Sequence, residues 1–391
     1  MPKKSDRNIL TRRDLFEFLQ EQMQTAYREL YDKKRLEYES TLIKTYLLEV
    51  DTKRVTFPQN TAFDLILKEL FTIKRHKESS KPVVNETNEK GFFEIKYKSV
   101  FNKEITFYLD SSTDERFWII YSLSDSKHLD DIVEYCSSKR TDIDRVWLWD
   151  KFLETIQKKG HPRGFGLDYD YRKFEPDEEE TVYLKMQLWG GKDTEELYRL
   201  LKSAENFRDK IVLSKVRFKK FDTHEVFALE DIKYNSKFTT RGTSFDVHQS
   251  IVTDIRQNYR EKLEKIENTY ALKWITKDNN GLQIEGYPLH FLPVDATFRI
   301  DTSLFCEKVF DGKMPFRLWG IVEDLNKWGK SIEAVDLHTG GKLTFEVYPD
   351  IISIYLPEGT CGNTVVRFFT NLQHKFSSLF EVKADDGTDI F

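Results

Sequence analysis

Three short segments between residues 93 and 121 have the patterns of β-strands, and they constrain the fold of this chain most strongly. Residues 93–98 (FEIKYK) and 105–109 (ITFYL) alternate apolar and polar side chains with a period of two, which is typical of strands with one buried face. Residues 117–121 (FWIIY) are apolar throughout, which favours a central strand over an edge strand. A helix is expected to follow over 127–136, with Leu129, Ile132 and Val133 on one side.

Helical spacing of apolar residues predicts two long amphipathic helices. The first follows Thr11 and Asp14, which form a capping-box pattern, and the second extends from Ile251 to Tyr270. The apolar side chains of the first helix are Phe16, Leu19, Met23, Ala26, Tyr27 and Leu30, and those of the second are Ile251, Ile255, Tyr259, Leu263, Ile266 and Tyr270. The other expected elements are helices at 62–73, 194–201 and 318–328, a hairpin of 165–174 with 181–189, and strands at 211–221, 282–285, 296–300, 343–348 and 351–356.

These elements predict an α+β protein with predominantly antiparallel sheets. A helical N-terminal segment should precede two mixed regions built from strand-strand-helix units. The polar stretch 74–90 lacks periodicity and is expected to be a loop or linker. The expected domains are 1–90, 91–222 and 223–391. A shift of 247 residues aligns 105–134 with 352–381, which leaves open either a duplicated strand-strand-helix module or a chance similarity of hydrophobic spacing.

The composition excludes several classes of protein. The 391 residues include 61 Lys+Arg and 66 Asp+Glu, so the net charge is −5 and any binding of nucleic acid must depend on local patches. A content of 14% aromatic residues argues against intrinsic disorder. The three cysteines are widely spaced, which argues against a disulfide framework and against a cysteine-based zinc site. Their small number favours a location in the reducing cytoplasm. We expect no membrane span, because no apolar run approaches about 18 residues.

A basic segment at residues 215–220 (KVRFKK) is the clearest local charge pattern. On a strand, Lys215, Arg217 and Lys219 would share one face at a spacing of about 7 Å, which matches the repeat of a phosphate backbone to order of magnitude. More cations and a tyrosine follow, and an exposed aromatic ring beside cations is a common device for binding single strands. The expected nucleic-acid-binding residues are Lys215, Arg217, Lys219, Lys233, Tyr234, Lys237 and Arg241. The alternative is a solvated sheet face neutralised by carboxylates of neighbouring strands.

Residues 158–166 (KKGHPRGFG) form a second basic segment. Glycines beside Lys158, Lys159, His161 and Arg163 could let the backbone approach a phosphate, so these four side chains are candidate phosphate contacts. The segment has neither the P-loop nor the dinucleotide-binding pattern. A plain helix-to-strand connection with Gly160 as the C-cap is favoured.

Evidence for catalytic chemistry in the sequence is weak. Asp168 and Asp170 would face the same way on a strand and could hold Mg²⁺, but a third acidic ligand cannot be placed. Glu94 and Lys96 have the Glu-x-Lys spacing of some metal-dependent nucleases, although such strings are frequent by chance. The eight histidines form no ligand cluster in the sequence, and the Asp336–His338 pair is explained as a turn. The seven tryptophans are expected in the core.

The sequence therefore favours a non-catalytic binding or accessory protein, which could act as one subunit of a larger complex. Its expected partner is nucleic acid, single-stranded by preference, or an acidic protein surface. The long amphipathic helices could also bind a protein partner. No cofactor is expected. The alternatives are a Mg²⁺-dependent phosphodiesterase or nuclease using Asp168 and Asp170, and a protein–protein interaction scaffold.

Overall fold

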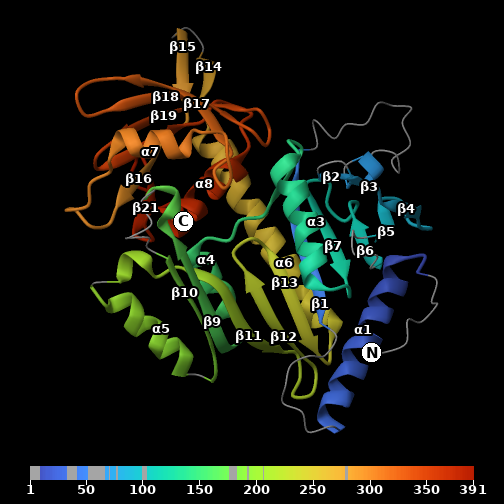
Figure 1. Ribbon diagram of the computed structural model, residues 1–391. Coiled ribbons are helices and arrows are strands. Elements are labelled where there is room, and N and C mark those ends of the chain that lie inside the picture. The colour runs from blue at the N-terminus through green and yellow to red at the C-terminus, as the bar shows by residue number, and fades with distance from the viewer. Residues whose placement is uncertain are drawn as a thin grey trace. The chain divides into compact units, whose positions relative to one another are not determined.

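In the computed structural model (Figure 1), the chain forms two compact units. The first contains Met1–Arg145, Lys219–Ile232 and Ser236–Asp254, and the second contains Val146–Phe218, Lys233–Asn235 and Ile255–Phe391. These units do not coincide with the three domain ranges expected from the sequence. The structure describes residues 9–32, 42–51, 67–69, 71–75, 78–98, 104–175, 183–191, 193–205, 207–277 and 281–391.

The first unit is built on an antiparallel sheet. Its strand order is β12-β13-β1-β7-β6-β5-β4, with β8 paired to β1 outside this path and β2 paired to β3 in a separate hairpin. The strand predicted to be central, β7, lies between β1 and β6. The bounds are α1 (Arg12–Asp32), β1 (Ile43–Val50), β2 (Ile73–Arg75), β3 (Glu78–Ser80), β4 (Val83–Glu86), β5 (Phe92–Lys98), β6 (Glu104–Asp110), β7 (Phe117–Ser122), α3 (Ser126–Lys139), β8 (Ile143–Arg145), β12 (Phe227–Lys233) and β13 (Lys237–Gly242).

Helix α3 packs its apolar side onto this sheet. Leu129, Ile132 and Val133 are buried in one hydrophobic cluster with Tyr46 of β1 and Ile120 of β7, as the helical spacing predicts. The Asp125 side chain caps the helix by accepting a hydrogen bond from the Lys127 backbone N–H at 2.8 Å.

The capping box predicted for the first helix is confirmed. The Asp14 backbone N–H donates to the Thr11 hydroxyl at 3.1 Å, and the Thr11 backbone N–H donates to the Asp14 carboxylate at 2.9 Å. Two backbone donors at the start of α1 are therefore satisfied reciprocally. Leu15, Leu19 and Met23 form the buried side of the helix.

The second unit contains two larger groups of strands and one hairpin. One group has the order β10-β9-β11, the other has the order β17-β18-β19-β20-β16-β21, and β14 pairs with β15. The bounds are α4 (Asp150–Gln157), β9 (His161–Asp170), η1 (Tyr171–Lys173), β10 (Tyr183–Trp189), α5 (Asp193–Ser203), η3 (Arg208–Lys210), β11 (Leu213–Phe221), α6 (Phe245–Lys265), η4 (Ile266–Tyr270), β14 (Lys273–Lys277), β15 (Gly281–Glu285), β16 (Leu289–Pro293), α7 (Thr302–Val309), β17 (Leu318–Asp324), β18 (Lys330–Asp336), β19 (Lys342–Tyr348), β20 (Ile351–Tyr355), α8 (Gly362–Lys375) and β21 (Phe380–Ala384). Strand β11 and helix α6 each have residues in both units.

Helix α8 is buried along almost its whole length, from Gly362 to His374. The guanidinium of Arg367 and the carboxylate of Asp336, both fully buried, form an ion pair, and the Thr364 hydroxyl donates to the same carboxylate at 2.5 Å. Burial opposes ionisation of Asp336, but Arg367 and the nearby His338 outweigh it and hold the pKa of that carboxyl below its usual value. The buried Asp336 and Arg367 are thus paired with each other rather than isolated.

The mixed α+β class is confirmed, with helices beside largely antiparallel sheets. All six apolar residues predicted for the second helix are buried, whereas on the first helix Leu19 and Met23 are buried and Tyr27 is exposed. Within the described residues, no helix is both long and apolar enough to cross a membrane.

Three local predictions are wrong. Residues 318–328 form strand β17 and a turn instead of a helix, and 296–300 form a turn instead of a strand. The expected linker at 74–90 contains β4, whose Val83 and Val84 pair with Lys96 and Ile95 of β5. The expected helix at 62–73 lies largely outside the described residues, and residues 67–69 are helical.

The similarity between 105–134 and 352–381 does not extend to the structure. Ile119 lies in strand β7, whereas its counterpart Val366 lies in helix α8. Leu129 lies in helix α3, whereas its counterpart Phe376 is the residue after α8. The second segment is strand, helix, strand, so the strand-strand-helix order expected for both segments is wrong for it.

Candidate nucleic-acid interface

The strands β9, β10 and β11 of the second unit lie side by side (Figure 1). One face of these strands carries polar and aromatic side chains, and we call it the open face. Along β10 the side chains alternate between exposed and half-buried, whereas Phe165, Leu167 and Tyr169 on the opposite face of β9 are buried. This alternation follows directly from the period of two in a strand. The open face comprises Gly164, Gly166, Asp168 and Asp170 of β9, Tyr183, Lys185, Gln187 and Trp189 of β10, and Lys215 and Arg217 of β11.

Trp189 is the main aromatic group of the open face, and 37% of this residue is exposed. It pairs with Gly164, whose φ is +144°. A Cβ at Gly164 would lie 2.4 Å from Cε3 of the indole, so the glycine makes room for the ring. From β11, the Arg217 guanidinium lies 3.8 Å and the Lys215 ammonium 4.5 Å from the ring centroid. Both cations therefore stabilise the indole position through cation–π contacts.

Tyr183, at the other end of β10, forms a second aromatic–cation pair. It is 47% exposed, and the guanidinium of Arg172 lies 4.9 Å from its ring centroid. Arg172 also donates to Asp170, which in addition accepts a hydrogen bond from Lys375 at 3.0 Å. The bonds from Arg172 and Lys375 lower the pKa of Asp170 far below its usual value, so this carboxylate is ionised at neutral pH.

The local charge of this face is positive although the whole chain is acidic. Lys185 lies between the two aromatic residues on β10, and its ammonium is 3.8 Å from Asp168. Arg172, Lys185, Lys215 and Arg217 supply four cations, against the two carboxylates of Asp168 and Asp170. Lys185 is half exposed, whereas Arg217 is buried beneath the indole. Arg217 thus supports the ring, and Lys185 is the more accessible cation.

The other predicted nucleic-acid-binding residues do not all belong to this face. Lys219, Lys237 and Arg241 lie in the first unit. Lys237 is buried and pairs with Asp130 of α3 at 2.6 Å, and Lys219 lies 3.5 Å from the ring centroid of Phe227. Arg241 is half-buried. Their role in binding stays a prediction, and the engagement of Lys237 with Asp130 counts against that residue.

Lys233 and Tyr234 lie in the second unit, but outside the open face. The Tyr234 ring packs against the buried His374 ring, with 4.0 Å between their centroids. Tyr234 is therefore engaged in packing.

The predicted phosphate contacts Lys158, Lys159, His161 and Arg163 are all exposed. The segment is a helix-to-strand connection, as favoured, because α4 ends at Gln157 and β9 begins at His161. Gly160 does not have the left-handed conformation of a typical C-cap glycine. Lys158 lines a cavity between α4, β9 and α5.

The Asp168 and Asp170 carboxylates do share one face, as predicted for a metal site. Both interact with cations, Asp168 with Lys185 and Asp170 with Arg172 and Lys375. No third acidic or histidine ligand joins them in the part of the chain that the structure describes. Both carboxylates are thus engaged by cations, which does not suit them to hold Mg²⁺.

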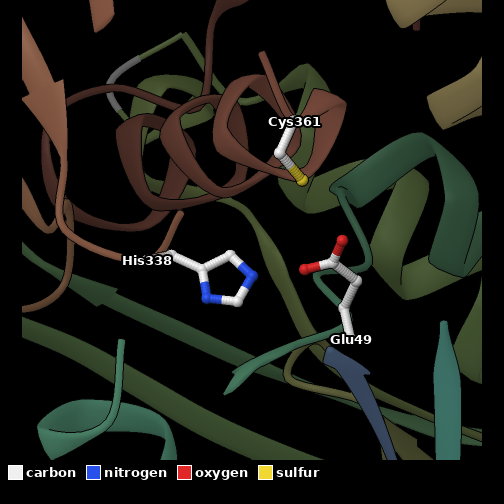
Figure 2. Close-up of side chains that lie close together, drawn as sticks. All are labelled: Glu49, His338 and Cys361. Atoms are coloured by element: carbon white, nitrogen blue, oxygen red, sulfur yellow. The ribbon is translucent and has the colours of Figure 1, made fainter. Parts of the chain in front are cut away.

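His338 and Cys361 bring potential metal-ligand atoms together within the second unit (Figure 2). His338 lies in the turn after β18 and Cys361 directly precedes α8, and their donor atoms are within 4.8 Å of each other. Because these two residues are far apart in the sequence, their proximity was not predicted. The third side chain in Figure 2, Glu49, belongs to the first unit, where it accepts a hydrogen bond from Arg116 at 3.1 Å. Two donor atoms alone do not define a metal centre.

Tyr183, Lys185 and Trp189 of the open face, and Arg172 beside it, were not among the binding residues predicted from the sequence. Trp189 was expected in the core together with the other tryptophans, and four of the seven are exposed instead: Trp189, Trp274, Trp319 and Trp328. The alternation of 183–189, with polar Lys185 and Gln187 on the same face as Tyr183 and Trp189, was the signal that could have placed Trp189 outside.

A family model described as MJECL33-like protein matches residues 3–391. The chain belongs to this family. An MJECL33-like relative from Methanocaldococcus jannaschii, named "Uncharacterized protein MJECL33", is 27% identical over 413 residues, covering 95% of this chain and 93% of the relative. Neither description states an activity, so the function of this MJECL33-like chain has to be argued from its geometry.

Proposed function

We propose that the open face binds single-stranded nucleic acid without catalysing a reaction. The observation that carries this proposal is Trp189, a partly exposed indole supported by Arg217 and Lys215. Such a ring offers a base a stacking surface whose position is already fixed. Lys185 and Lys215 supply positive charge beside it for the phosphate backbone.

A single strand suits this face better than a duplex. Stacking on Trp189 or Tyr183 requires an unpaired base that can turn its flat side toward the sheet. The two rings stand six residues apart on β10, or about 20 Å along the strand. A bound strand would therefore run along β10 and contact Lys185 between the two rings.

An interaction scaffold is the second candidate function. Large apolar side chains are exposed on the β14–β15 hairpin and on strand β17, which is typical of surfaces that contact other proteins. They are Trp274, Leu282, Ile284, Trp319, Ile321 and Val322. This reading predicts a stable protein complex on co-purification and no affinity for oligonucleotides.

In this proposal, the chain is a cytoplasmic accessory protein that acts as one subunit of a larger assembly. All three cysteines are free thiols, with Cys136 and Cys306 buried, which is consistent with a reducing compartment. The Mg²⁺-dependent nuclease remains the less favoured alternative, because Asp170 is bound by Arg172 and Lys375.

Replacing Trp189 by Ala tests the proposal. We expect this change to weaken binding of a fluorescently labelled single strand by about 1–3 kcal/mol, or roughly 5- to 150-fold, because one stacking surface is lost. Fluorescence anisotropy with oligo(dT) and oligo(U) gives the dissociation constants. The matched control is Trp319→Ala, which removes an exposed tryptophan from β17 and should leave the affinity unchanged.

Two results would refute the proposal. One is that the unaltered chain does not bind either oligonucleotide at low salt. The other is that Trp189→Ala and Trp319→Ala weaken binding equally, since this would show that affinity does not depend on the open face.

A further inference from the structure

A cavity of about 400 Å³ lies between α4, the start of β9 and α5 in the second unit. Its volume falls in the range of small-molecule sites. Its lining combines acidic and basic side chains with one tyrosine: Glu154, Lys158, Glu195, Tyr198, Arg199 and Lys202. The cavity is separate from the open face, because Tyr198 packs against Phe165 on the opposite face of β9.

The wall of this cavity is fixed by a buried hydrogen-bond network. The Asp150 carboxylate, 5% exposed, accepts bonds from the Leu213 backbone N–H at 2.8 Å, the Tyr198 hydroxyl at 3.2 Å and the Lys202 ammonium at 2.6 Å. Lys202 also donates to Glu154 at 2.6 Å, and the same carboxylate lies 3.0 Å from the Tyr198 hydroxyl, whose single proton is shared between Asp150 and Glu154. Two carboxylates four residues apart on α4 therefore hold one ammonium in place.

The protonation states of this network are well defined. Burial opposes the charge of Lys202, but Asp150 and Glu154 outweigh that effect and raise its pKa above the usual value. Burial and the same two carboxylates raise the pKa of Tyr198, which therefore stays a neutral phenol. An ammonium has three N–H groups, and Asp150 and Glu154 accept two of them. Among the described residues the third has no acceptor, so it can donate to a ligand.

The residues that line the cavity include three cations and two carboxylates. The cations are Lys158, Arg199 and Lys202, and the carboxylates are those of Glu154 and Glu195. Arg199 is 72% exposed and directs one N–H group to Glu195, which leaves other donors of its guanidinium for a ligand. With the Asp150 carboxylate, which binds Lys202, the group holds three cations and three carboxylates.

We propose that this cavity binds a phosphorylated small molecule, with Lys158, Arg199 and Lys202 contacting its phosphate. Guanidinium and ammonium groups are the usual protein donors to phosphate, and here they come from two helices around one opening. The buried Asp150 and Tyr198 keep Lys202 in position before the ligand arrives. This site goes beyond the proposed strand binding, and it uses no residue of the open face.

Isothermal titration calorimetry with ribose 5-phosphate tests the inference, with ribose as the phosphate-free comparison. We expect binding of ribose 5-phosphate and no detectable binding of ribose. The double variant Lys158→Gln/Arg199→Gln should weaken binding roughly tenfold or more. Both side chains project into solvent or the cavity, so the fold should tolerate this change. Lys151→Gln/Arg299→Gln removes two exposed cations elsewhere in the same unit and should have no effect.

Three results would overturn the inference: no binding of ribose 5-phosphate at millimolar concentration, equal binding of ribose, or equal losses in the two double variants. Trp189→Ala should leave ribose 5-phosphate binding unchanged, because this ligand has no base to stack. Failure of this site and failure of strand binding at the open face are therefore distinguishable.

Discussion

His374 of helix α8 is a buried histidine in the second unit. Its Nδ1 lies 2.7 Å from the Asp168 carbonyl oxygen, and its ring packs against Tyr234. Burial lowers the pKa of His374, the bond to Asp168 opposes this shift and the neighbouring Lys375 reinforces it, so that the pKa falls to about 4. At neutral pH the ring is therefore neutral, with Nδ1–H as the donor to Asp168.

The stability of the chain should depend on pH through His374. The folded pKa is about 4 and the unfolded value is about 6.5, so the unfolded state binds the proton more readily between these values. The free energy of unfolding should fall as the pH drops from 6.5 to 4, by about 3 kcal/mol in total from this residue. Urea unfolding at several pH values measures the loss.

His374→Asn is the matched variant, because its amide can still donate to the Asp168 carbonyl but does not titrate. The pH dependence of the variant should be shallower than that of the unaltered chain over the same interval. Identical pH dependence would show that His374 is not the titrating group.

The open face combines residues that the sequence pattern indicates with residues that it does not. Lys215 and Arg217 were predicted to share one face because charge alternation in a strand is visible in the sequence. Their contact with the Trp189 ring was not visible in the sequence. This ring comes from β10, and its position depends on the Gly164–Trp189 pairing. The interactions that hold Lys237 and Asp170 also come from residues distant in the sequence, Asp130 and Lys375.

Strand β17 shows where periodicity misleads at the scale of an element. Residues 318–328 satisfied a helical spacing, but a short apolar segment fits a strand equally well. The Asn326 side chain accepts bonds from the Trp328 and Gly329 backbone N–H groups, so this stretch turns into a hairpin with β18. Likewise, the Asp295 side chain binds the Thr297 N–H at 2.9 Å and creates a turn where a strand was expected.

The start of helix α1 was predicted correctly from the sequence, and the capping role of Thr11 there can be tested. Thr11→Ala removes the hydroxyl that accepts the Asp14 backbone N–H, and we expect the free energy of unfolding to fall by about 0.5–2 kcal/mol. Urea unfolding measures this change. The control is Thr25→Ala in the exposed middle of α1, where alanine should be neutral or slightly stabilising. Equal destabilisation by both changes would contradict a capping role for Thr11.

At the scale of the whole molecule, the fold class could be predicted from the sequence, but the division of the chain into compact units could not. Clear periods of two and 3.6 identified strands such as β5 and β6 and helices such as α1 and α6, because burial of one face imposes those periods on the sequence. Strands such as β12, β13 and β16 were not predicted. The compact units were missed because each combines distant parts of the chain, with residues 219–232 and 236–254 joining 1–145. The expected linker at 74–90 is polar, and β4 within it forms because β5 supplies a pairing partner.

The salt dependence of strand binding tests the central claim most directly. For a single strand, the logarithm of the binding constant should fall linearly with the logarithm of the salt concentration, with a slope of about 0.7 per phosphate contact. Lys185→Gln/Lys215→Gln should make this slope shallower by about 1.4, because two contacts are lost, whereas Lys151→Gln/Arg299→Gln should leave it unchanged. An equal slope for the Lys185/Lys215 variant and the unaltered chain, measured from about 50 to 200 mM salt, would contradict strand binding at the open face.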